Sequence, residues 1–300
     1  MPPTPPSNVP ITCPGGRAEP SKRSLLVPEL PEVETARRLL EEKLAGRQIL
    51  AVDVRCRQLR WPVDSEIADR LPGSRLAAIR RRAKYLILET DRGAAISHLG
   101  MSGRWRVVPW DHPLEKHDHV DVSFEGGVVA RYHDPRRFGA LLWGGAAPLA
   151  HVRLAEIGPE PWGGPAVAEI AEHLWRAARG RKIPLRDFLL DGRVIAGVGN
   201  IYASEAAFGA GIRPTIAAGR ISRLRYGALA DSLRTVLETS IERGGTTLRD
   251  FSDPEGNAGR YGERCAVYGR AGETCDRCKG VIRRRVHQAR SLFYCPGCQK

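Results

Sequence analysis

The chain has 300 residues, of which 42% are hydrophobic, and a formal net charge of +13. This length suffices for two globular domains. The charge indicates a polyanionic partner, and nucleic acid is the first candidate. A basic protein without such a partner is the alternative. No run of about 18 apolar residues occurs, which excludes a membrane-spanning helix, and the cysteine pattern excludes a disulfide framework, so a reducing cytoplasm is expected.

Residues 1–26 are rich in Pro, Ser and Gly and show little periodicity, which is typical of disorder. They also lack the apolar core of a secretory signal. From Pro31 a helix is expected, because proline suits the first helical position and Glu32 and Glu34 favour the positive end of a helix. Gly46 is expected to end it. The apolar face of this helix consists of Val33, Ala36, Leu40 and Leu44.

Strand patterns dominate from there to about residue 145. Short alternating or apolar runs are separated by Gly, Pro and Asp turns, which is typical of a β-sandwich or a barrel. The predicted strands cover 84–90, 94–100, 104–108, 119–124, 127–133 and 139–143.

Beyond about residue 166 the apolar period becomes helical. A glycine- and charge-rich loop, 252–264, then leads to the C-terminal cysteines. The predicted helical segments cover 166–180, 183–192, 200–211 and 222–245.

Four of the seven cysteines form two C-x2-C pairs that are separated by sixteen residues. This spacing lets four thiolates converge on one ion and suits a β-hairpin, so it predicts one structural Zn²⁺, with a redox dithiol pair as the rival interpretation. Because four protein ligands leave no open coordination position, such a metal would fold the tail without taking part in chemistry. The predicted ligands are Cys275, Cys278, Cys295 and Cys298.

An arginine-rich stretch joins the two cysteine pairs. On a rigid hairpin it would form a finger that contacts phosphates, whereas a solvated charged face is the alternative. Its members are Arg283, Arg284, Arg285, His287 and Arg290.

The longest motifs, in chain order, are "PELPEVET" (28–35), "RRRAKYLIL" (80–88), "SHLGMSGRW" (97–105), "KHDHVDV" (116–122), "YHDPRRFGALLW" (132–143), "GVGNIYASEA" (197–206), "GGTTLRDF" (244–251) and "RSLFYCPGCQ" (290–299). Together they resemble the formamidopyrimidine-DNA glycosylase family of bacterial base-excision repair enzymes. The resemblance covers nearly everything from Pro28 to Lys300, and "ELPEVE" points to the branch that removes oxidised purines.

The resemblance implies an α+β multidomain fold, with an N-terminal β-sandwich opened by one helix, a helix–two-turn–helix domain and a zinc finger on a C-terminal β-hairpin. Double-stranded DNA with oxidised bases would bind in the cleft between the domains of a monomer in the bacterial cytoplasm, associated with the nucleoid. The expected divisions are 28–150 for the sandwich, 151–251 for the helical DNA-binding domain, 252–264 for a lesion-recognition loop and 265–300 for the finger, with 1–27 as a disordered extension absent from the mature protein.

Pro28 and Glu29 carry the chemistry that the resemblance implies. The family nucleophile is the α-amine of an N-terminal proline, and an α-amine with a pKa of about 8 is partly neutral at physiological pH. As a secondary amine it attacks the sugar C1′ and leaves a cationic iminium, an electron sink that promotes elimination of both flanking phosphates. Glu29 matches the general acid that protonates the deoxyribose ring oxygen. Taken alone, Pro28 would be a helix-entry proline and Glu29 a partner of the helix dipole.

Lys84 and Arg290 are grouped with the catalytic residues. Lys84 matches a family residue that contacts the phosphates flanking the lesion, although by itself it would be part of a solvated strand face. Arg290 and Asn200 match residues that pinch the backbone, because a kinked strand lowers the cost of base extrusion. Arg186 stands where a family lysine is expected; the charge is kept but the geometry differs, so it is left outside the core site.

Met101, Arg136 and Phe138 match the family trio that fills the void left by the extruded nucleotide. An apolar wedge and a guanidinium for the orphaned base offset the cost of the gap, and Arg136 is inferred to read the opposite cytosine. Without the motifs, Met101 and Phe138 would be interpreted as core residues.

Two further patterns indicate no site. The "GVGN" stretch, 197–200, lacks the G-x-G-x-x-G spacing of a dinucleotide loop. His98, His117 and His119 have no partner at ligand spacing and are interpreted as structural or as weak backbone contacts.

The expected function is that of a bifunctional DNA glycosylase and abasic-site lyase that excises 8-oxoguanine and formamidopyrimidines through a proline Schiff base and β,δ-elimination. An oxidised-pyrimidine glycosylase is the alternative within the superfamily. A non-catalytic lesion-binding protein is the alternative if the extension is retained, because an amide nitrogen at Pro28 cannot form the iminium. A zinc-finger transcription factor would not need "PELPEVET".

Val27 is expected to mark the true start of the protein. A GUG codon is read as valine internally and as methionine at initiation, and the excess of arginine over lysine indicates GC-rich coding, in which such starts are common. Methionine before proline is readily trimmed, which would leave Pro28 as a free secondary amine. Cleavage after Val27 by a protease and a long inactive protein are the alternatives.

Overall fold

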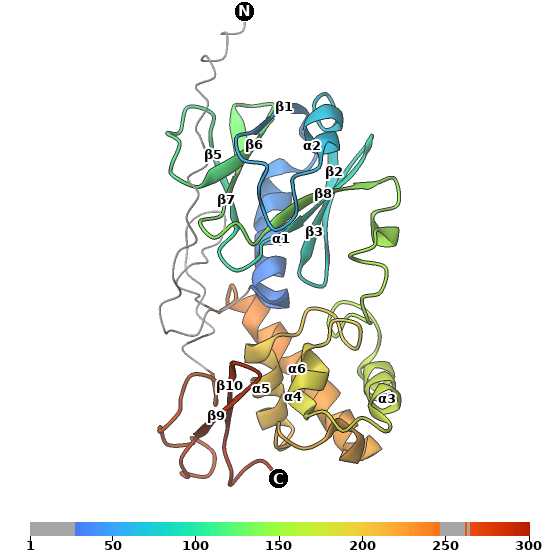
Figure 1. The fold of residues 1–300 in the computed structure, drawn as a ribbon, viewed down its shortest axis with the longest axis vertical. Helices are drawn as coiled ribbons and strands as arrows, with labels where there is room; N and C mark the ends of the chain where they lie inside the picture. Colours follow the sequence, from blue (N-terminus) through green and yellow to red (C-terminus); the bar gives the residue numbers. More distant parts are fainter. Residues whose placement is uncertain (1–27, 247–261, 263–264) are drawn as a thin grey trace, which may run out of the picture.

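The computed structural model describes residues 28–246, 262 and 265–300, which form a β-sandwich, a helical domain and a C-terminal hairpin (Figure 1). The predicted extension, 1–27, lies outside the described residues, as does most of the predicted lesion-recognition loop, 252–264. None of the described helices is both long and apolar enough to cross a membrane.

The leading helix α1 spans Leu30–Leu44, and its predicted apolar face is confirmed. All four predicted positions are at most 2% exposed, because their spacing keeps them on one side of the helix. Gly46 follows with a φ of +81°, in the left-handed region that favours glycine after a helix. The buried face packs against β2, β3 and β5, so that α1 belongs to the sandwich core.

Two four-stranded antiparallel sheets form the sandwich, in the strand orders β1-β6-β7-β5 and β2-β3-β4-β8. Leu86, Val120 and Tyr132 from both sheets share one apolar core, which confirms the sandwich over the barrel. The strands are β1 (Ile49–Val54), β2 (Leu76–Arg82), β3 (Tyr85–Thr90), β4 (Gly93–His98), β5 (Arg104–Pro109), β6 (Asp118–Phe124), β7 (Val128–His133) and β8 (Ala140–Gly145).

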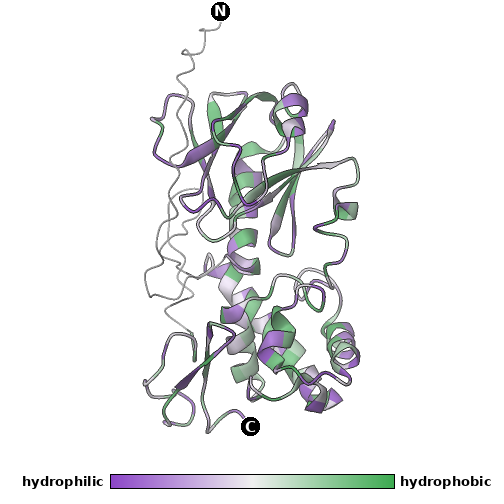
Figure 2. Cartoon of the chain, viewed as in Figure 1, coloured by the Kyte–Doolittle hydropathy of each residue, from purple (hydrophilic) through white to green (hydrophobic). Residues whose placement is uncertain are grey.

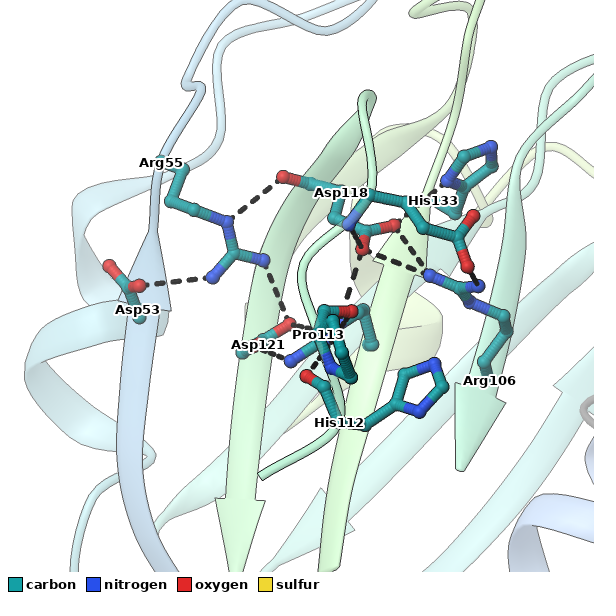
Figure 3. A network of polar contacts seen from close by, with 10 residues as sticks. Asp53, Arg55, Arg106, His112, Pro113, Asp118, Asp121 and His133 are labelled. Carbon is teal, nitrogen blue, oxygen red and sulfur yellow. Dashed lines mark hydrogen bonds and ion pairs between the residues drawn. The ribbon is translucent and has the colours of Figure 1, made fainter. Parts of the chain in front are cut away.

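A network of charged side chains lies on the β1-β6-β7-β5 sheet (Figure 3). The Asp118 carboxylate accepts hydrogen bonds of 2.8 and 2.9 Å from Arg106 and lies 2.8 Å from His133 Nδ1. Arg131 donates bonds of 2.9 and 3.0 Å to Asp121. Burial alone would raise the pKa of Asp118, but the contacts with His133 and Arg106 hold that pKa below its usual value. Because these buried charges are paired, the network is a structural element of the sheet.

The helical domain is built on α5 (Asn200–Gly209), in which every residue from Ile201 to Phe208 is buried. This helix packs against the long α6 (Arg223–Glu242), and α6 in turn packs against α3. Helices lie within all four predicted helical segments. The remaining helices of the described chain are α2 (Ser65–Arg70), η1 (Pro148–Ala150), α3 (Val167–Ala178), α4 (Leu185–Leu190) and η2 (Ala218–Arg220).

The C-terminal hairpin consists of β9 (Arg283–His287) and β10 (Arg290–Tyr294), as the spacing of the cysteine pairs predicts. All five residues of β9 are exposed, and the strand is coloured hydrophilic in Figure 2. The tail is attached to the helical domain through a small apolar cluster that includes Phe208, Val267, Ile282 and Phe293.

Candidate active site

The carboxylate of Glu29 lies against the N-terminus of α5. Its Oε1 atom accepts a hydrogen bond of 3.0 Å from the backbone N–H of Ile201, and the N–H of Tyr202 donates to Oε2 at 3.4 Å. Gly199 permits this approach, since a Cβ atom there would lie 2.2 Å from the Glu29 Cδ. Pro28, the neighbour of Glu29 in the chain, is also buried. The free amides of a helix N-terminus therefore point at the predicted acid.

Glu29 and Lys84 perturb each other's protonation. Burial raises the pKa of the Glu29 carboxyl to about 7, against the opposing charge of Lys84. Burial also lowers the pKa of the Lys84 ammonium, which the charges of Glu29 and Glu32 oppose. A carboxyl group that titrates near neutral pH can both donate and accept a proton under physiological conditions.

The fully buried Glu32 links Glu29 to two distant parts of the chain. Its Oε2 atom accepts from the Glu29 backbone N–H at 2.9 Å. Its Oε1 atom accepts from the Tyr202 hydroxyl at 2.6 Å and from the Thr246 backbone N–H at 2.7 Å. Sequence reasoning missed this role and took Glu32 as a partner of the helix dipole. The one local signal is its position three residues after Glu29, which is typical of helix capping.

The turn before Lys84 is held by Glu160, which lies between the sandwich and the helical domain. Glu160 accepts hydrogen bonds from the Ala83 backbone N–H at 2.6 Å and from the guanidinium groups of Arg81 and Arg82 at 2.7 and 3.0 Å. Ala83 has a φ of +52°, an unfavourable conformation that these contacts hold in place. The backbone that carries Lys84 is thus fixed from outside its own sheet.

A cavity of about 370 Å³ opens beside Lys84, and His98 lines it. Burial lowers the pKa of His98 to about 3, and the charge of Lys84 adds to this effect. Its Nδ1 atom accepts a hydrogen bond of 3.0 Å from the Gly100 backbone N–H, so the ring is neutral with its proton on Nε2. His119 lies 2.8 Å from the Asp134 carbonyl oxygen. No cluster of three potential metal ligands among the described residues includes His98, His117 or His119.

Asn200 is the first residue of α5 and Arg290 is the first residue of β10, and these two elements contact each other. The Asn200 Nδ2 atom donates to the Ser291 carbonyl at 2.8 Å, while its buried Oδ1 has no hydrogen-bond partner in the described part of the chain. Arg290 lies close enough to Lys84 to lower the pKa of its ammonium group. The structure therefore gathers Lys84, Asn200 and Arg290, from three separate elements, around Glu29.

Met101, Arg136 and Phe138 lie on two loops that Asp134 joins. The fully buried Asp134 carboxylate accepts from the Ser102 hydroxyl at 2.6 Å and from the Arg136 backbone N–H at 3.3 Å. The Arg136 guanidinium lies 4.9 Å from the centre of the Phe138 ring, and Phe138 is 43% exposed. Met101 is half-buried. Phe138 is thus not a core residue, and sequence reasoning missed Asp134, whose position in the "DPRRF" turn was its one signal.

The four C-terminal cysteines converge, as predicted. Their Sγ atoms lie within 4.8 Å of one another, with 3.8 Å between Cys275 and Cys298 and 3.3 Å between Cys278 and Cys295. Tetrahedral zinc with Zn–S bonds of about 2.3 Å separates its sulfur ligands by about 3.8 Å. The thiols are therefore placed to hold a single ion.

Comparison with known protein families shows to which family the chain belongs. The family model of the formamidopyrimidine-DNA glycosylase N-terminal domain matches residues 27–141, and the H2TH domain model of the same enzyme matches residues 157–252. The chain belongs to the formamidopyrimidine-DNA glycosylase family. The fold class that the motifs implied is confirmed with it.

Formamidopyrimidine-DNA glycosylases from several bacteria are similar to this chain over their whole length. The enzyme of Thioalkalivibrio sulfidiphilus is 48% identical over 274 residues, which are 91% of this chain and 100% of the relative. The enzyme of Methylococcus capsulatus is 49% identical over the same shares.

Solved glycosylase structures share the fold. A complex of the Lactococcus lactis enzyme with N7-benzyl-Fapy-dG DNA has a TM-score of 0.81 at 32% identity, covering 91% of this chain and 100% of that one. Another complex of that enzyme, with DNA that contains an abasic site, has a TM-score of 0.81 at 32% identity, with 91% and 99% covered. A complex with DNA that contains an oxidised pyrimidine has a TM-score of 0.80 at 32% identity, with 91% and 100% covered.

Proposed function

We propose that this glycosylase excises oxidised purines, namely 8-oxoguanine and formamidopyrimidines, from double-stranded DNA and then cleaves the strand at the abasic site. The observation that carries the proposal is the buried Glu29 carboxyl, with a pKa of about 7, placed next to Pro28 and facing the cationic Lys84. The relatives' name and the Lactococcus lactis complexes with Fapy-dG and abasic-site DNA support the substrate class.

In the proposed reaction the Pro28 nitrogen attacks C1′ of the damaged nucleotide. The new N–C1′ bond replaces the bond to the base, which leaves with that electron pair and takes up a proton. After the attached nitrogen has lost its N–H proton, its lone pair breaks the bond between C1′ and the ring oxygen, Glu29 protonates that oxygen, and the product is a cationic iminium. Loss of a C2′ proton then expels the 3′ phosphate, and a second elimination expels the 5′ phosphate. Glu29 is the neighbour of Pro28 in the chain, and its pKa of about 7 suits it to protonate the ring oxygen.

This chemistry requires a free secondary amine, and we propose that the active form begins at Pro28. Within a longer chain, the Pro28 nitrogen belongs to a tertiary amide and has no basic lone pair. The position of Val27, directly before Pro28, fits initiation at a GUG codon followed by removal of methionine. The match to the family model, which begins at residue 27, supports the same boundary.

Phosphate contacts are proposed for Lys84, Asn200 and Arg290, which converge beside Glu29. The Asn200 Nδ2 atom carries a second N–H besides the one that it donates to Ser291, and together with the grouped cations it suits a kinked strand that bends around the extruded nucleotide. Phe138 is 43% exposed, and the Arg136 guanidinium lies 4.9 Å from the centre of its ring. Together with Met101, it suits insertion into the gap that an extruded nucleotide leaves in the base stack. We assign the opposite-base contact to Arg136, whose Nη1 atom is buried without a partner among the described residues.

We further propose that the cysteine cluster binds one structural Zn²⁺. All four thiols would serve as ligands, which leaves no position for a water or a substrate. When bound, the ion would hold the base of the hairpin that carries Arg290, and it would supply folding energy instead of chemistry.

Excision of oxidised pyrimidines is the second candidate, because a Lactococcus lactis neighbour of this fold was solved with DNA that contains an oxidised pyrimidine. The two candidates share Pro28 and Glu29 and differ in the base that the site accepts. Single-turnover rates on 8-oxoguanine and on an oxidised pyrimidine, each opposite its normal partner base, separate them. A higher rate on the pyrimidine would replace the purine assignment.

The main test compares two recombinant forms, one that begins at Pro28 and one that carries residues 1–27 uncleaved. Each is mixed with duplex DNA that contains 8-oxoguanine opposite cytosine, and borohydride is added to reduce any iminium. We expect a trapped covalent complex and strand cleavage with the first form and neither with the second. Trapping by the intact long form, with its mass confirmed, would overturn Pro28 as the nucleophile.

A further inference from the structure

The tip of the C-terminal hairpin is a two-residue turn that sets the direction of Arg290. Gln288 and Ala289 both have positive φ angles, of 48° and 57°, as in the tight turns that match the twist of paired strands. His287 and Arg290 flank this turn and are paired across the two strands. Whatever holds His287 therefore also fixes the backbone from which the Arg290 side chain projects.

Two consecutive residues of α4 hold His287 from the helical domain. The Arg186 Nη2 atom donates to the His287 carbonyl oxygen at 3.0 Å. The His287 Nδ1 atom lies 2.9 Å from Asp187 Oδ2, and Asp187 Oδ1 lies 3.0 Å from Arg186 Nε. The Arg186 and Asp187 side chains are only 1% and 11% exposed, so the contact lies on the buried side of the hairpin.

The negative charge of the Asp187 carboxylate acts on Arg186 and His287. Its Oδ2 atom is buried and makes no well-directed hydrogen bond within the described ranges, so His287 and Arg186 are the groups that meet its charge. Burial lowers the pKa of Arg186; the Asp187 charge opposes that shift, and the charge of Arg290 adds to it. Asp187 thus offsets the repulsion between two guanidinium groups that converge on the same region.

The other strand of the hairpin is held independently. On β10, the Ser291 carbonyl accepts from Asn200 of α5 at 2.8 Å. Phe293, also on β10, belongs to the apolar cluster around Phe208. The contacts of His287 with Arg186 and Asp187 therefore attach the β9 end, and loss of the Asp187 contact would loosen the tip without detaching the finger.

We propose that Asp187 is a positioning residue for Arg290: through His287 it fixes the hairpin tip so that the Arg290 guanidinium is held towards a phosphate next to the lesion. The inference rests on the DNA contact proposed above for Arg290. Asp187 itself does not touch the DNA in this arrangement.

The experiment uses the full chain from Pro28 and measures the dissociation constant for duplex DNA that contains a tetrahydrofuran abasic-site analogue. Asp187→Ala and His287→Ala should each weaken binding by about tenfold, and the double variant should be no weaker than either single one. His287→Asn places an amide N–H₂ near the position of Nδ1 and should lose less than His287→Ala. In an Arg290→Ala background, Asp187→Ala should have no further effect.

Asp231→Ala is the matched control, because Asp231 is an exposed acid on α6 of the same domain. Removing either carboxylate makes the protein more positive, which by itself strengthens DNA binding. If Asp187→Ala binds DNA more weakly and Asp231→Ala does not, the loss of affinity therefore cannot result from the change in net charge. Zinc content, measured on each variant, should stay at the wild-type value.

Four outcomes would count against the inference. If Arg290→Ala binds as tightly as the wild type, the proposed contact of Arg290 fails and the role of Asp187 fails with it. If Arg290→Ala is weak but Asp187→Ala is not, the positioning role alone is wrong. The same holds if Asp187→Ala weakens binding equally with and without Arg290. If Asp187→Ala loses its zinc, the test rests on the DNA affinities of His287→Asn and His287→Ala. Equal losses of affinity in these two variants would count against the positioning role of Asp187.

Discussion

The site around Glu29 and the C-terminal finger are held together in different ways. Glu29 and Glu32 lie in the main apolar core, and their carboxylates are met by backbone amides of α5 and by the Tyr202 hydroxyl. The finger has a fully exposed strand, β9, and a small apolar cluster that it shares with Phe208 of α5. The first region is organised by packing and the second by four thiols and a few contacts at its tip. Damage to one should therefore spare the other.

The largest difference between the two regions is expected from Glu29→Gln, which removes the carboxyl proton donor and keeps the size of the side chain. Because glutamine cannot donate the proton, the single-turnover excision rate should fall by about 10²–10⁴-fold, while affinity for lesion DNA stays within a few-fold of the wild type. Glu34→Gln is the control, since Glu34 is also a buried acid of α1 but pairs with Arg37 and Arg38. A rate within a few-fold of the wild type in Glu29→Gln would remove Glu29 from the mechanism.

The converse break is Cys295→Ser, which should disorder the finger and weaken DNA binding by about 10²-fold, because the phosphate contacts of the hairpin are lost. The sandwich should keep its melting transition, as measured by circular dichroism of the purified variant. Cys56→Ser is the control, because Cys56 is buried in the sandwich and lies outside the four-cysteine cluster. Full DNA affinity in Cys295→Ser, or wild-type protein without zinc by elemental analysis, would contradict the assignment.

The packed region should also show its own pH dependence of stability. Burial raises the pKa of Glu29 from 4.5 to about 7, so the folded state favours the neutral carboxyl. This contribution is present below about pH 4.5 and is lost as the pH rises through 7. Between pH 5 and 8, the free energy of unfolding of the wild type should fall by about 2–3 kcal/mol relative to Glu29→Gln. Parallel curves from denaturant titrations of the two proteins would show that Glu29 has an ordinary pKa.

The smallest effect is expected from Arg136→Ala, on the loops joined by Asp134. The variant should lose about tenfold of its preference for a lesion opposite cytosine over one opposite adenine, since a guanidinium contact to one base discriminates by that order. General DNA affinity should change less. Excision rates on the two duplexes measure the preference, and an unchanged ratio would remove the opposite-base role of Arg136.

Sequence patterns predicted the elements that bury one clean face. The α1 helix and three of the four helical segments follow their apolar spacing, whereas α5 is buried on all sides. Six of the eight sandwich strands overlap predicted runs. The patterns did not predict β1 or β2, nor the short helix α2 (Ser65–Arg70). In β1, Leu50 is 56% exposed, so alternation is lost, and six residues of α2 are too few to show a helical period.

The candidate site was predictable only in part, because its contacts join residues far apart in the chain. Motifs identified Glu29 and Lys84, but the hydrogen bond from Thr246 to Glu32 spans 214 residues, and the contact from Arg186 to His287 spans 101. No local period carries such information. The buried Asp134 was missed for a related reason: an aspartate in a turn is usually a surface residue, and its burial depends on the neighbouring loop.

The burial of Glu29 against α5 indicates when, during synthesis, the N-terminus of the active form would be trimmed. Glu29 meets the backbone of Ile201, 172 residues further along, so the pocket around the first catalytic residues cannot close until that helix has been synthesised. At about 5–20 residues per second, translation takes roughly ten to thirty seconds to reach it. If the active form begins at Pro28, we expect the preceding residue to be removed most readily during this interval, before Glu29 is buried. Removal of that residue would then take place on the growing chain, before the enzyme folds around the proposed nucleophile.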